Sequence, residues 1–253
     1  MVRHAFAAGL AVLLAGQGAV ACAQSDASVV APDPVAATCR PQFAVDGQAI
    51  AAGTAFVLDL TPPPRPDNPL APRAEQVMLV TALHLFGPNG GLPAQILSAD
   101  LPQHVGLTTC RGAQGQAWTA RRTLAIAGAV PMAMPFRDVA GFATDAVGVA
   151  GAERLRLADR PPAVGDDVWV VAAMTADGRV RRHAARVIYV GDNALQYVFV
   201  DATLQLRASS GAAVVNAAGQ VVGLHLGGGV DRGDLVGMAV PPSRLRALVE
   251  AAQ

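Results

Sequence analysis

Short apolar runs broken by turn residues are the feature that most limits what this chain can fold into. The runs are rich in valine and in other β-branched or aromatic residues, which favour strands. Glycine, proline, asparagine and aspartate separate them, as at Asp177-Gly178 and Ala218-Gly219. The clearest runs are 53–58, 77–80, 168–171, 186–190, 197–200, 213–215 and 221–224. This spacing predicts an all-β fold, either a barrel or a sandwich.

Three segments interrupt the strand pattern and suggest how the chain is divided. The proline-rich segment 61–72 is predicted to be a surface loop, because proline lacks the amide hydrogen that a central strand needs. Segment 242–250 has apolar residues on one helical face and predicts a C-terminal helix. Segment 160–165 is interpreted as a crossover between two halves. The halves are an N-terminal β-barrel at 42–160 and a C-terminal β-barrel with the terminal helix at 161–253.

The N-terminal residues 1–23 have the pattern of an export signal. Arg3 precedes an apolar stretch, and small residues then predict cleavage after Ala23. A membrane anchor is the alternative, but glycine and glutamine interrupt the stretch, so the mature chain is expected to have no membrane span. Lipid attachment at Cys22 is a second alternative. Residues 24–41 are predicted to be a mobile leader, and the protein is predicted to be periplasmic or secreted.

Cleavage after Ala23 removes Cys22, and lipid attachment would modify it. In both cases Cys39 and Cys110 are the remaining unmodified cysteines. A pair in an exported chain predicts a disulfide, and two buried free thiols are the alternative. No His/Cys cluster has metal-ligand spacing, so neither a metal nor another cofactor is expected. The formal net charge is zero and long basic runs are absent, which argues against nucleic acid as a partner. The chain is expected to be a monomer.

Three stretches contain the side chains that a serine nucleophile requires: the nucleophile itself, a base, and a group that orients the base. An apolar strand ends in a Thr-Ala-x-His sequence at His84. Asp138 leads into an apolar run, and a Ser-Gly turn at Ser210 enters another strand. Together they predict a hydroxyl nucleophile, an imidazole base and an orienting carboxylate.

Two of these assignments have a neighbour that competes with them. Asp145 lies seven residues after Asp138 and is the alternative acid. Ser209 is the alternative nucleophile, but only Ser210 directly precedes Gly211. We therefore favour Asp138 and Ser210.

In this order the three stretches resemble the chymotrypsin-like serine peptidases of bacterial type. Members of that family carry Thr-Ala-Ala-His at the base, Asp followed by Ile/Leu-Ala at the acid, and Gly-x-Ser-Gly at the nucleophile. Segment 53–57, Gly-Thr-Ala-Phe-Val, is similar to the strand that precedes the family's histidine. The resemblance covers residues 48–253. The nucleophile comes last in the chain, which argues against an α/β-hydrolase.

The resemblance implies two packed six-stranded antiparallel β-barrels with the catalytic groups in the cleft between them. Ser210 would attack a peptide carbonyl, His84 would transfer the proton, and Asp138 would orient His84. The backbone amides of Ala208 and Ser210 would form the oxyanion hole. The implied activity is that of a secreted or periplasmic serine endopeptidase, which forms an acyl-enzyme with protein or peptide substrates.

One departure from the family pattern affects the oxyanion hole. The family has glycine two residues before the nucleophile, whereas this chain has Ala208. Alanine adopts a positive φ only at a cost in free energy. This departure motivates an alternative function, a non-catalytic binding module on the same fold.

A second group of positions concerns substrate specificity. Trypsin-like members carry an aspartate six residues before the nucleophile, where this chain has Leu204, so a preference for basic residues is not expected. His225, with Gly227 shortly after it, resembles a stretch of bacterial glutamyl endopeptidases in which a histidine helps to bind an acidic side chain. These three residues are the predicted specificity pocket. The alternative for His225 is a histidine packed beneath the pocket wall.

Overall fold

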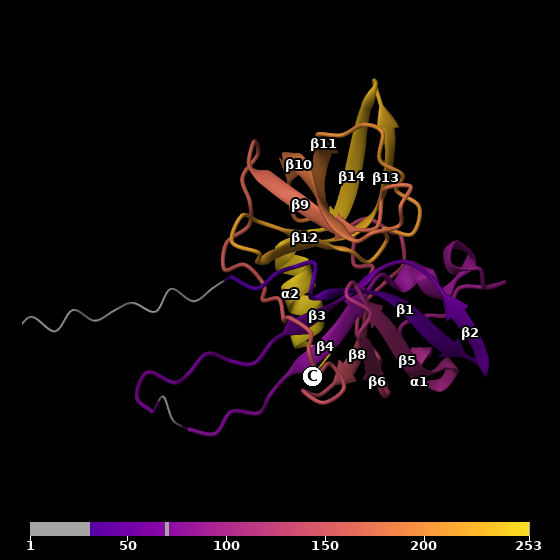
Figure 1. Cartoon of the computed structure of the whole chain (residues 1–253), viewed down its shortest axis with the longest axis vertical. Helices are drawn as coiled ribbons and strands as arrows, with labels where there is room; N and C mark the ends of the chain where they lie inside the picture. Colours follow the sequence, from indigo (N-terminus) through magenta and orange to yellow (C-terminus); the bar gives the residue numbers. More distant parts are fainter. Residues whose placement is uncertain (1–30, 69–70, 253) are drawn as a thin grey trace, which may run out of the picture. The chain divides into compact units, whose positions relative to one another are not determined.

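The structure is a computed structural model that describes residues 31–68 and 71–252. The predicted export signal 1–23, which includes Cys22, lies outside the described residues, as does the leader up to residue 30. The main regular elements of the described chain are two β-sheets and a C-terminal helix (Figure 1). No helix in residues 31–68 and 71–252 is long and apolar enough to cross a membrane.

The N-terminal sheet has eight strands in the order β6-β5-β1-β3-β4-β8-β7, with β2 paired to β1. Its strands are β1 Thr38–Val45, β2 Gln48–Ala51, β3 Ala55–Asp59, β4 Val77–Thr81, β5 Val105–Gly112, β6 Ala117–Ala120, β7 Arg122–Leu124 and β8 Ala140–Thr144. Short helical segments follow β4, namely η1 Leu83–Phe86, η2 Pro88–Gly90 and α1 Leu101–His104. All of the strand pairings are antiparallel.

Three phenylalanine rings form the centre of this sheet's core. Phe43 lies 4.7 Å from Phe86 and 5.5 Å from Phe142, measured between ring centroids. All three side chains are buried, and they come from β1, η1 and β8. Aromatic rings in offset or edge contact add to the free energy gained from burial alone. The core therefore joins the segment that carries His84 to two strands of the sheet.

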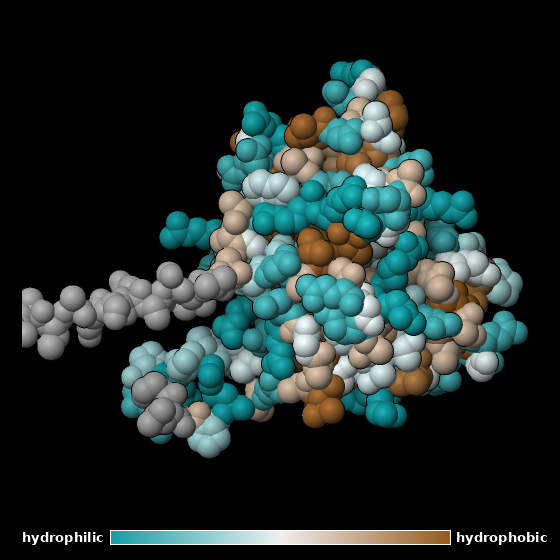
Figure 2. All heavy atoms as spheres, viewed as in Figure 1, coloured by the Kyte–Doolittle hydropathy of each residue, from teal (hydrophilic) through white to brown (hydrophobic). Residues whose placement is uncertain are grey.

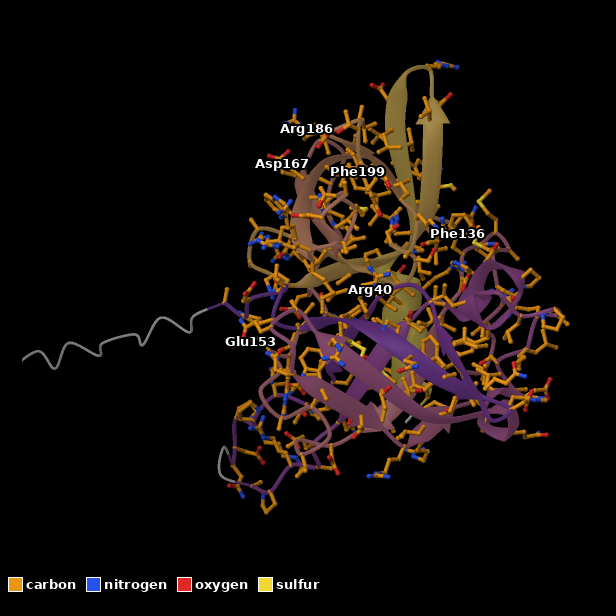
Figure 3. The ribbon with its side chains drawn as sticks, turned by 45° about the vertical axis from the view of Figure 1, so that its right-hand side comes forward. Arg40, Phe136, Glu153, Asp167, Arg186 and Phe199 are labelled. Carbon is orange, nitrogen blue, oxygen red and sulfur yellow. A yellow bond between two sulfur atoms is a disulfide. The ribbon has the colours of Figure 1, made fainter. Side chains whose placement is uncertain are left out.

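The C-terminal sheet is a closed barrel in the order β10-β11-β14-β13-β12-β9. Its strands are β9 Asp167–Ala172, β10 Arg181–Val190, β11 Leu195–Phe199, β12 Ala213–Val215, β13 Val221–Asp231 and β14 Asp234–Val240. Along β11 the residues Leu195, Tyr197 and Phe199 are buried, and the residues between them are partly exposed. This alternation is typical of a strand with one face toward a core. Figure 3 shows Phe199 within this barrel.

The predicted C-terminal helix is present as α2, Pro242–Glu250. Its buried residues Leu245, Leu248 and Val249 belong to the same hydrophobic cluster as the core of the N-terminal sheet. That cluster also includes facing residues of the C-terminal barrel, among them Val221. The helix follows the second barrel in sequence, yet it packs into the region that joins the two barrels (Figure 1).

The predicted fold class, two packed antiparallel β-barrels with a C-terminal helix, is confirmed. The count of eight strands in the first sheet differs from the expected six for two reasons. Only Arg121 separates β6 from β7, so one bent stretch pairs with β5 through its first part and with β8 through its second. The short strand β2 is an additional hairpin partner of β1.

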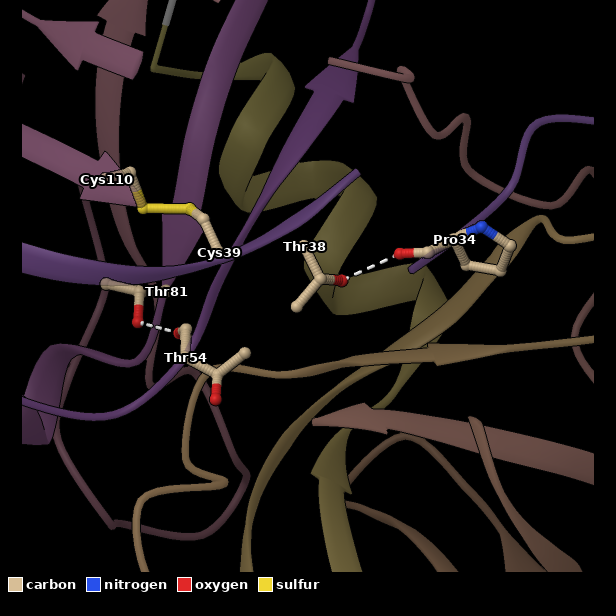
Figure 4. Close-up of a disulfide and its surroundings, with 6 residues drawn as sticks. All are labelled: Pro34, Thr38, Cys39, Thr54, Thr81 and Cys110. Atoms are coloured by element: carbon tan, nitrogen blue, oxygen red, sulfur yellow. Dashed lines mark hydrogen bonds between the residues drawn. A yellow bond between two sulfur atoms is a disulfide. The ribbon is translucent and has the colours of Figure 1, made fainter. Parts of the chain in front are cut away.

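The described domain begins earlier than the predicted leader boundary at residue 41. Strand β1 starts at Thr38, and Ala37 before it is buried. The Thr38 hydroxyl donates to the Pro34 carbonyl at 2.8 Å (Figure 4). The Val57 amide donates to the Ala37 carbonyl at 2.9 Å. Residues 38–41 of the expected leader 24–41 are therefore strand, because backbone pairing with β3 and β5 orders them.

The predicted disulfide between Cys39 and Cys110 is present (Figure 4). It links the neighbouring strands β1 and β5, with a Cα–Cα distance of 5.6 Å. Both cysteines are buried in the core. The alternative, two free thiols, is therefore wrong.

The surface drawn in Figure 2 mixes hydrophilic and hydrophobic residues. The hydrophobic residues of the described chain form separate small areas on this face, with polar residues between them. A permanent protein interface usually presents a larger continuous apolar patch. On this face we therefore see no surface of that kind among the described residues.

Candidate active site

His84 lies just beyond the end of a central strand. All five residues of β4 are buried, and β4 pairs with β3 on one side and with β8 on the other. After Thr81 the chain enters the 3₁₀ segment η1, which contains His84. The His84 residue is only 3% exposed. A strand paired on both sides gives this histidine a rigid support.

Asp138 precedes β8, the strand beside β4, and its carboxylate faces His84. Oδ2 accepts a hydrogen bond from the His84 Nδ1–H at 2.8 Å, and Oδ1 accepts one from the His84 amide at 2.9 Å. The Met132 amide also donates to Oδ2, at 2.8 Å. Asp138 is fully buried, so these bonds replace the water that a carboxylate would otherwise bind.

The bond to Asp138 also determines which ring nitrogen of His84 is available for chemistry. Nδ1 must carry a hydrogen to donate to a carboxylate, so Nε2 of the neutral ring is an acceptor. No residue in the described part of the chain forms a hydrogen bond with Nε2 of His84. This is the arrangement required of a general base.

The alternative acid, Asp145, is placed elsewhere. It is exposed beyond the end of β8, and its Oδ1 accepts the Gly148 amide hydrogen at 2.7 Å within a turn. The structure therefore brings Asp138, and not Asp145, to His84. The reason is strand register, because Thr81 pairs with Ala140 and thereby sets Asp138 beside η1.

The Ser210 turn belongs to the C-terminal half of the chain but is hydrogen-bonded to Thr54, which directly precedes β3 of the N-terminal sheet. The Thr54 amide donates to the Ser210 carbonyl at 2.9 Å, and the Thr54 hydroxyl donates to the Ala208 carbonyl at 2.8 Å. The Thr81 hydroxyl in turn donates to the Thr54 carbonyl at 2.6 Å (Figure 4). Thr81 lies three residues before His84, so these bonds hold the turn against the strand end that leads to the histidine.

Gly211 allows this close contact. Its φ is +88°, and a Cβ at this position would come within 2.2 Å of both the Thr54 carbonyl oxygen and the Thr81 hydroxyl oxygen. Only glycine fits both the conformation and the space. The Ser-Gly sequence found in the chain thus has a packing reason in addition to its resemblance to a nucleophile turn.

The Ser210 hydroxyl is hydrogen-bonded to the main chain and not to His84. Its Oγ donates to the Leu226 carbonyl at 2.9 Å, and no hydrogen bond joins it to His84 among the described residues. The structure brings the histidine, the aspartate and the serine turn into one region, but only His84 and Asp138 are directly bonded.

The predicted oxyanion-hole residues lie on this turn. Ala208 has a φ of +63°, so it adopts the left-handed conformation that its position predicted. An L-residue pays about 1 kcal/mol for this conformation. Within the described residues, neither the Ala208 amide nor the Ser210 amide donates a hydrogen bond to a protein acceptor. Both amide hydrogens are therefore left without a protein acceptor in the described chain, as an oxyanion hole requires.

The predicted specificity pocket is not supported at two of its three positions. Leu204 is 8% exposed and packs in the core of the C-terminal barrel, because its apolar side chain points into the barrel. His225 is 0% exposed, and both of its ring nitrogens have partners inside the protein. It offers no free nitrogen to a substrate carboxylate. Gly227 is partly exposed and follows Leu226, whose carbonyl accepts the Ser210 hydroxyl.

His225 instead matches the alternative, a histidine packed in the interior. Burial, and to a lesser extent the neighbouring His84, lowers the pKa of His225 to about 3. The ring is therefore neutral at neutral pH. Burial also raises the pKa of its partner Tyr197.

Several residues around the site were not singled out from the sequence. Thr54 lies in a segment whose similarity to the family was noted, but its hydroxyl contact with Ala208 spans 154 positions in the chain. The Met132 amide holds Asp138 from a loop that has no sequence signal of its own. The sequence presents Ser209 only as a rival nucleophile, whereas in the structure its hydroxyl accepts a hydrogen bond from His225. The only sequence signal for Ser209 is that it forms a Ser-Ser pair with Ser210.

No protein-family model matches the sequence, and no curated protein sequence matches it either. Solved structures of serine proteases do match the fold. The active form of the Rv3671c protease from M. tuberculosis is 14% identical with a TM-score of 0.53, and the match covers 87% of this chain and 82% of that one.

Two further serine protease structures also match the fold. A thermostable serine protease, AL20, from an extremophilic microorganism is 13% identical with a TM-score of 0.54, covering 86% of this chain and 97% of that one. The serine endoprotease from Yersinia pestis is 14% identical with a TM-score of 0.52, covering 86% of this chain but 62% of that one. At such identities the likeness is one of fold. The chain therefore has the fold of these serine proteases, two packed β-barrels of the chymotrypsin-like type.

Proposed function

We propose that this protein is a serine endopeptidase that uses Ser210 as nucleophile, His84 as general base and Asp138 as the orienting acid. The observation that carries the proposal is the buried His84–Asp138 pair, which follows the strand end that Thr54 links to the Ser210 turn by hydrogen bonds. The serine proteases that share the fold support the reaction class. The substrate class is protein or peptide.

The reaction would begin when Ser210 Oγ attacks a peptide carbonyl and its proton passes to His84 Nε2. Asp138 would stabilise the imidazolium that forms. The amides of Ala208 and Ser210 would donate to the oxyanion of the tetrahedral intermediate. The C–N bond would then break, with His84 returning the proton to the leaving amine, and water would hydrolyse the acyl-enzyme by the reverse sequence of proton transfers.

One rearrangement is required before this chemistry. The Ser210 hydroxyl must leave the Leu226 carbonyl and turn about its Cα–Cβ bond toward His84. A neutral hydrogen bond contributes about 1 kcal/mol net, which is small beside a catalytic barrier. A bound substrate that aligns the hydroxyl would offset this cost.

We also propose that the protein is exported to the periplasm or secreted. The Cys39–Cys110 disulfide supports this location, because structural disulfides persist in oxidising compartments. The sequence of residues 1–23 supports it independently as an export signal.

A non-catalytic binding module is the second candidate. Two observations favour it: alanine at position 208, and a Ser210 hydroxyl bonded to Leu226 rather than to His84. A module of this kind would keep the cleft between the barrels but would not form a covalent adduct at its serine.

A fluorophosphonate probe separates the two candidates. We expect labelling at Ser210 alone, and loss of labelling together with a decrease in kcat of about six orders of magnitude in Ser210→Ala. Ser243→Ala, at an exposed serine, is the control and should behave as the unmodified protein. Peptide hydrolysis and the labelled residue are measured by mass spectrometry. Equal hydrolysis by Ser210→Ala would overturn the proposal, and absence of both labelling and hydrolysis would favour the binding module.

A further inference from the structure

A buried chain of hydrogen bonds lies directly behind the nucleophile turn. His225, on β13, is 0% exposed. The distance from its Nδ1 to the Tyr197 hydroxyl is 2.6 Å, and the distance from its Nε2 to the Ser209 hydroxyl is 2.9 Å. The Ser209 hydroxyl donates to the Leu206 carbonyl at 2.6 Å. We refer to Tyr197, His225 and Ser209 as the buried relay.

The direction of every bond in the relay follows from the available hydrogens. Ser209 uses its single hydroxyl hydrogen on the Leu206 carbonyl, so it must accept from His225. His225 Nε2 therefore carries the ring hydrogen, and Nδ1 accepts from the Tyr197 hydroxyl. Each buried polar atom of the relay is thus satisfied in one arrangement only, which makes the relay rigid.

The main chain of His225 holds the same turn. Its carbonyl accepts the Gly211 amide hydrogen at 2.7 Å, and its amide donates to the Ala212 carbonyl at 2.9 Å. The rings of Tyr197 and Phe199 each lie 6.1 Å from the His225 ring and limit its movement. One residue therefore anchors the chain both before and after Ser210.

This geometry bears on the oxyanion donors. The peptide that joins Ser209 to Ser210 carries the Ser210 N–H, so the orientation of Ser209 sets the direction of that donor. We propose that His225, fixed by Tyr197, is a positioning residue that holds Ser209 and thereby aims the Ser210 amide and side chain. The proposal rests on the proposed peptidase function and replaces the predicted role of His225 in a specificity pocket.

Two conservative variants break the relay at different points. Ser209→Ala removes the side-chain bond from His225 to the turn and leaves the two main-chain bonds, whereas Tyr197→Phe removes only the distant hydroxyl. A misaimed oxyanion donor weakens transition-state binding more than substrate binding. We expect kcat to fall about tenfold to a hundredfold in Ser209→Ala, and less in Tyr197→Phe, while KM changes by less than about threefold.

A substrate series distinguishes positioning from specificity. Peptide amides with Glu, Asp or Leu at the cleaved position are compared for the unmodified protein and for both variants. We expect the ratio of kcat/KM between glutamyl and leucyl substrates to stay the same. A selective loss of glutamyl cleavage would instead identify His225 as an acid-binding residue and would overturn the proposal.

A core variant without a polar contact is the control for stability. Val170→Ala opens a cavity in the same barrel, where Val170 is fully buried, and leaves the relay in place. It should lower the melting temperature without lowering kcat. If Val170→Ala and Ser209→Ala lower kcat equally at similar melting temperatures, the effect is one of stability and the positioning role is wrong.

A spectroscopic measurement keeps the proposal testable even if the protein has no hydrolytic activity. We expect Tyr197→Phe to shift the Ser210 amide resonance in a ¹H–¹⁵N spectrum, because the relay transmits the change across Ser209. Val170→Ala should leave that resonance in place. An unmoved Ser210 amide in Tyr197→Phe overturns the relay, whereas failure of the serine probe to label Ser210 overturns only the peptidase function.

Discussion

In the N-terminal sheet a buried carboxylate holds His84, whereas in the C-terminal barrel a phenol and a serine hydroxyl hold His225. Both histidines are buried, but only the first has a negative partner that can stabilise a cationic ring. His225 has neutral partners, and burial and His84 lower its pKa to about 3. The charge of the partner therefore suits one histidine to proton transfer and the other to directing hydrogen bonds.

The two barrels also differ in how they are stabilised. A disulfide joins β1 and β5 of the N-terminal sheet, while the described C-terminal barrel contains none. The C-terminal barrel is instead closed by strand pairing all the way around. Its Ser210 turn accepts hydrogen bonds from Thr54, which directly precedes β3 of the other sheet, so these bonds join the two regions at the candidate site.

The largest effect expected from this comparison concerns the charged partner of His84. Asp138→Asn keeps the shape but removes the charge and favours the wrong tautomer of His84. We expect kcat to fall by about four orders of magnitude, measured by peptide hydrolysis. Asp145→Asn is the matched control, since Asp145 is exposed, and should leave kcat unchanged. If Asp145→Asn lowered kcat and Asp138→Asn did not, Asp145 would be the acid, and the contrast between the partners of His84 and His225 would be wrong.

An intermediate effect tests the difference in cross-linking. The disulfide closes a loop with a sequence separation of 71 residues. Replacing Cys39 and Cys110 by alanine should lower the free energy of unfolding by about 4 kcal/mol on the chain-entropy model. Urea unfolding followed by tryptophan fluorescence provides the measurement.

The two tryptophans allow each barrel to be followed in that experiment. Trp118 is buried in β6 of the N-terminal sheet, and Trp169 lies in β9 of the C-terminal barrel. In a Trp169→Phe background the remaining signal reports the N-terminal sheet. We expect its midpoint to fall when the disulfide is removed. An unchanged midpoint would mean that the cross-link does not stabilise this sheet.

The smallest effect concerns the strained turn of the C-terminal barrel. Ala208→Gly removes the cost of a positive φ but increases the freedom of the unfolded chain. We expect a net gain of at most about 1 kcal/mol, seen as a rise in melting temperature of about 2–4 °C. Ala217→Gly, at an exposed alanine without a positive φ, should instead lower the melting temperature. A decrease in both variants would contradict strain at Ala208.

Much of the fold could be predicted from local patterns along the chain. Alternation of apolar and polar residues depends on neighbouring positions, so the strand runs, the helix at 242–250 and the proline-rich loop are visible in the sequence. The bend at Arg121 that separates β6 from β7 was not visible, because it depends on which strands lie on either side. The early start of β1 at Thr38 likewise depends on pairing with β3 and β5.

The sequence by itself determined the strand pattern, the cysteine pair and the order of His84, Asp138 and Ser210, because these are properties of residue type and spacing. Only the tertiary structure decided which hydrogen bonds these residues form. Strand register selected Asp138 over Asp145, and the pairing of β11 with β14 and of β14 with β13 brought Tyr197 to His225. Such partners are far apart in the chain, and their choice depends on packing that no local pattern records.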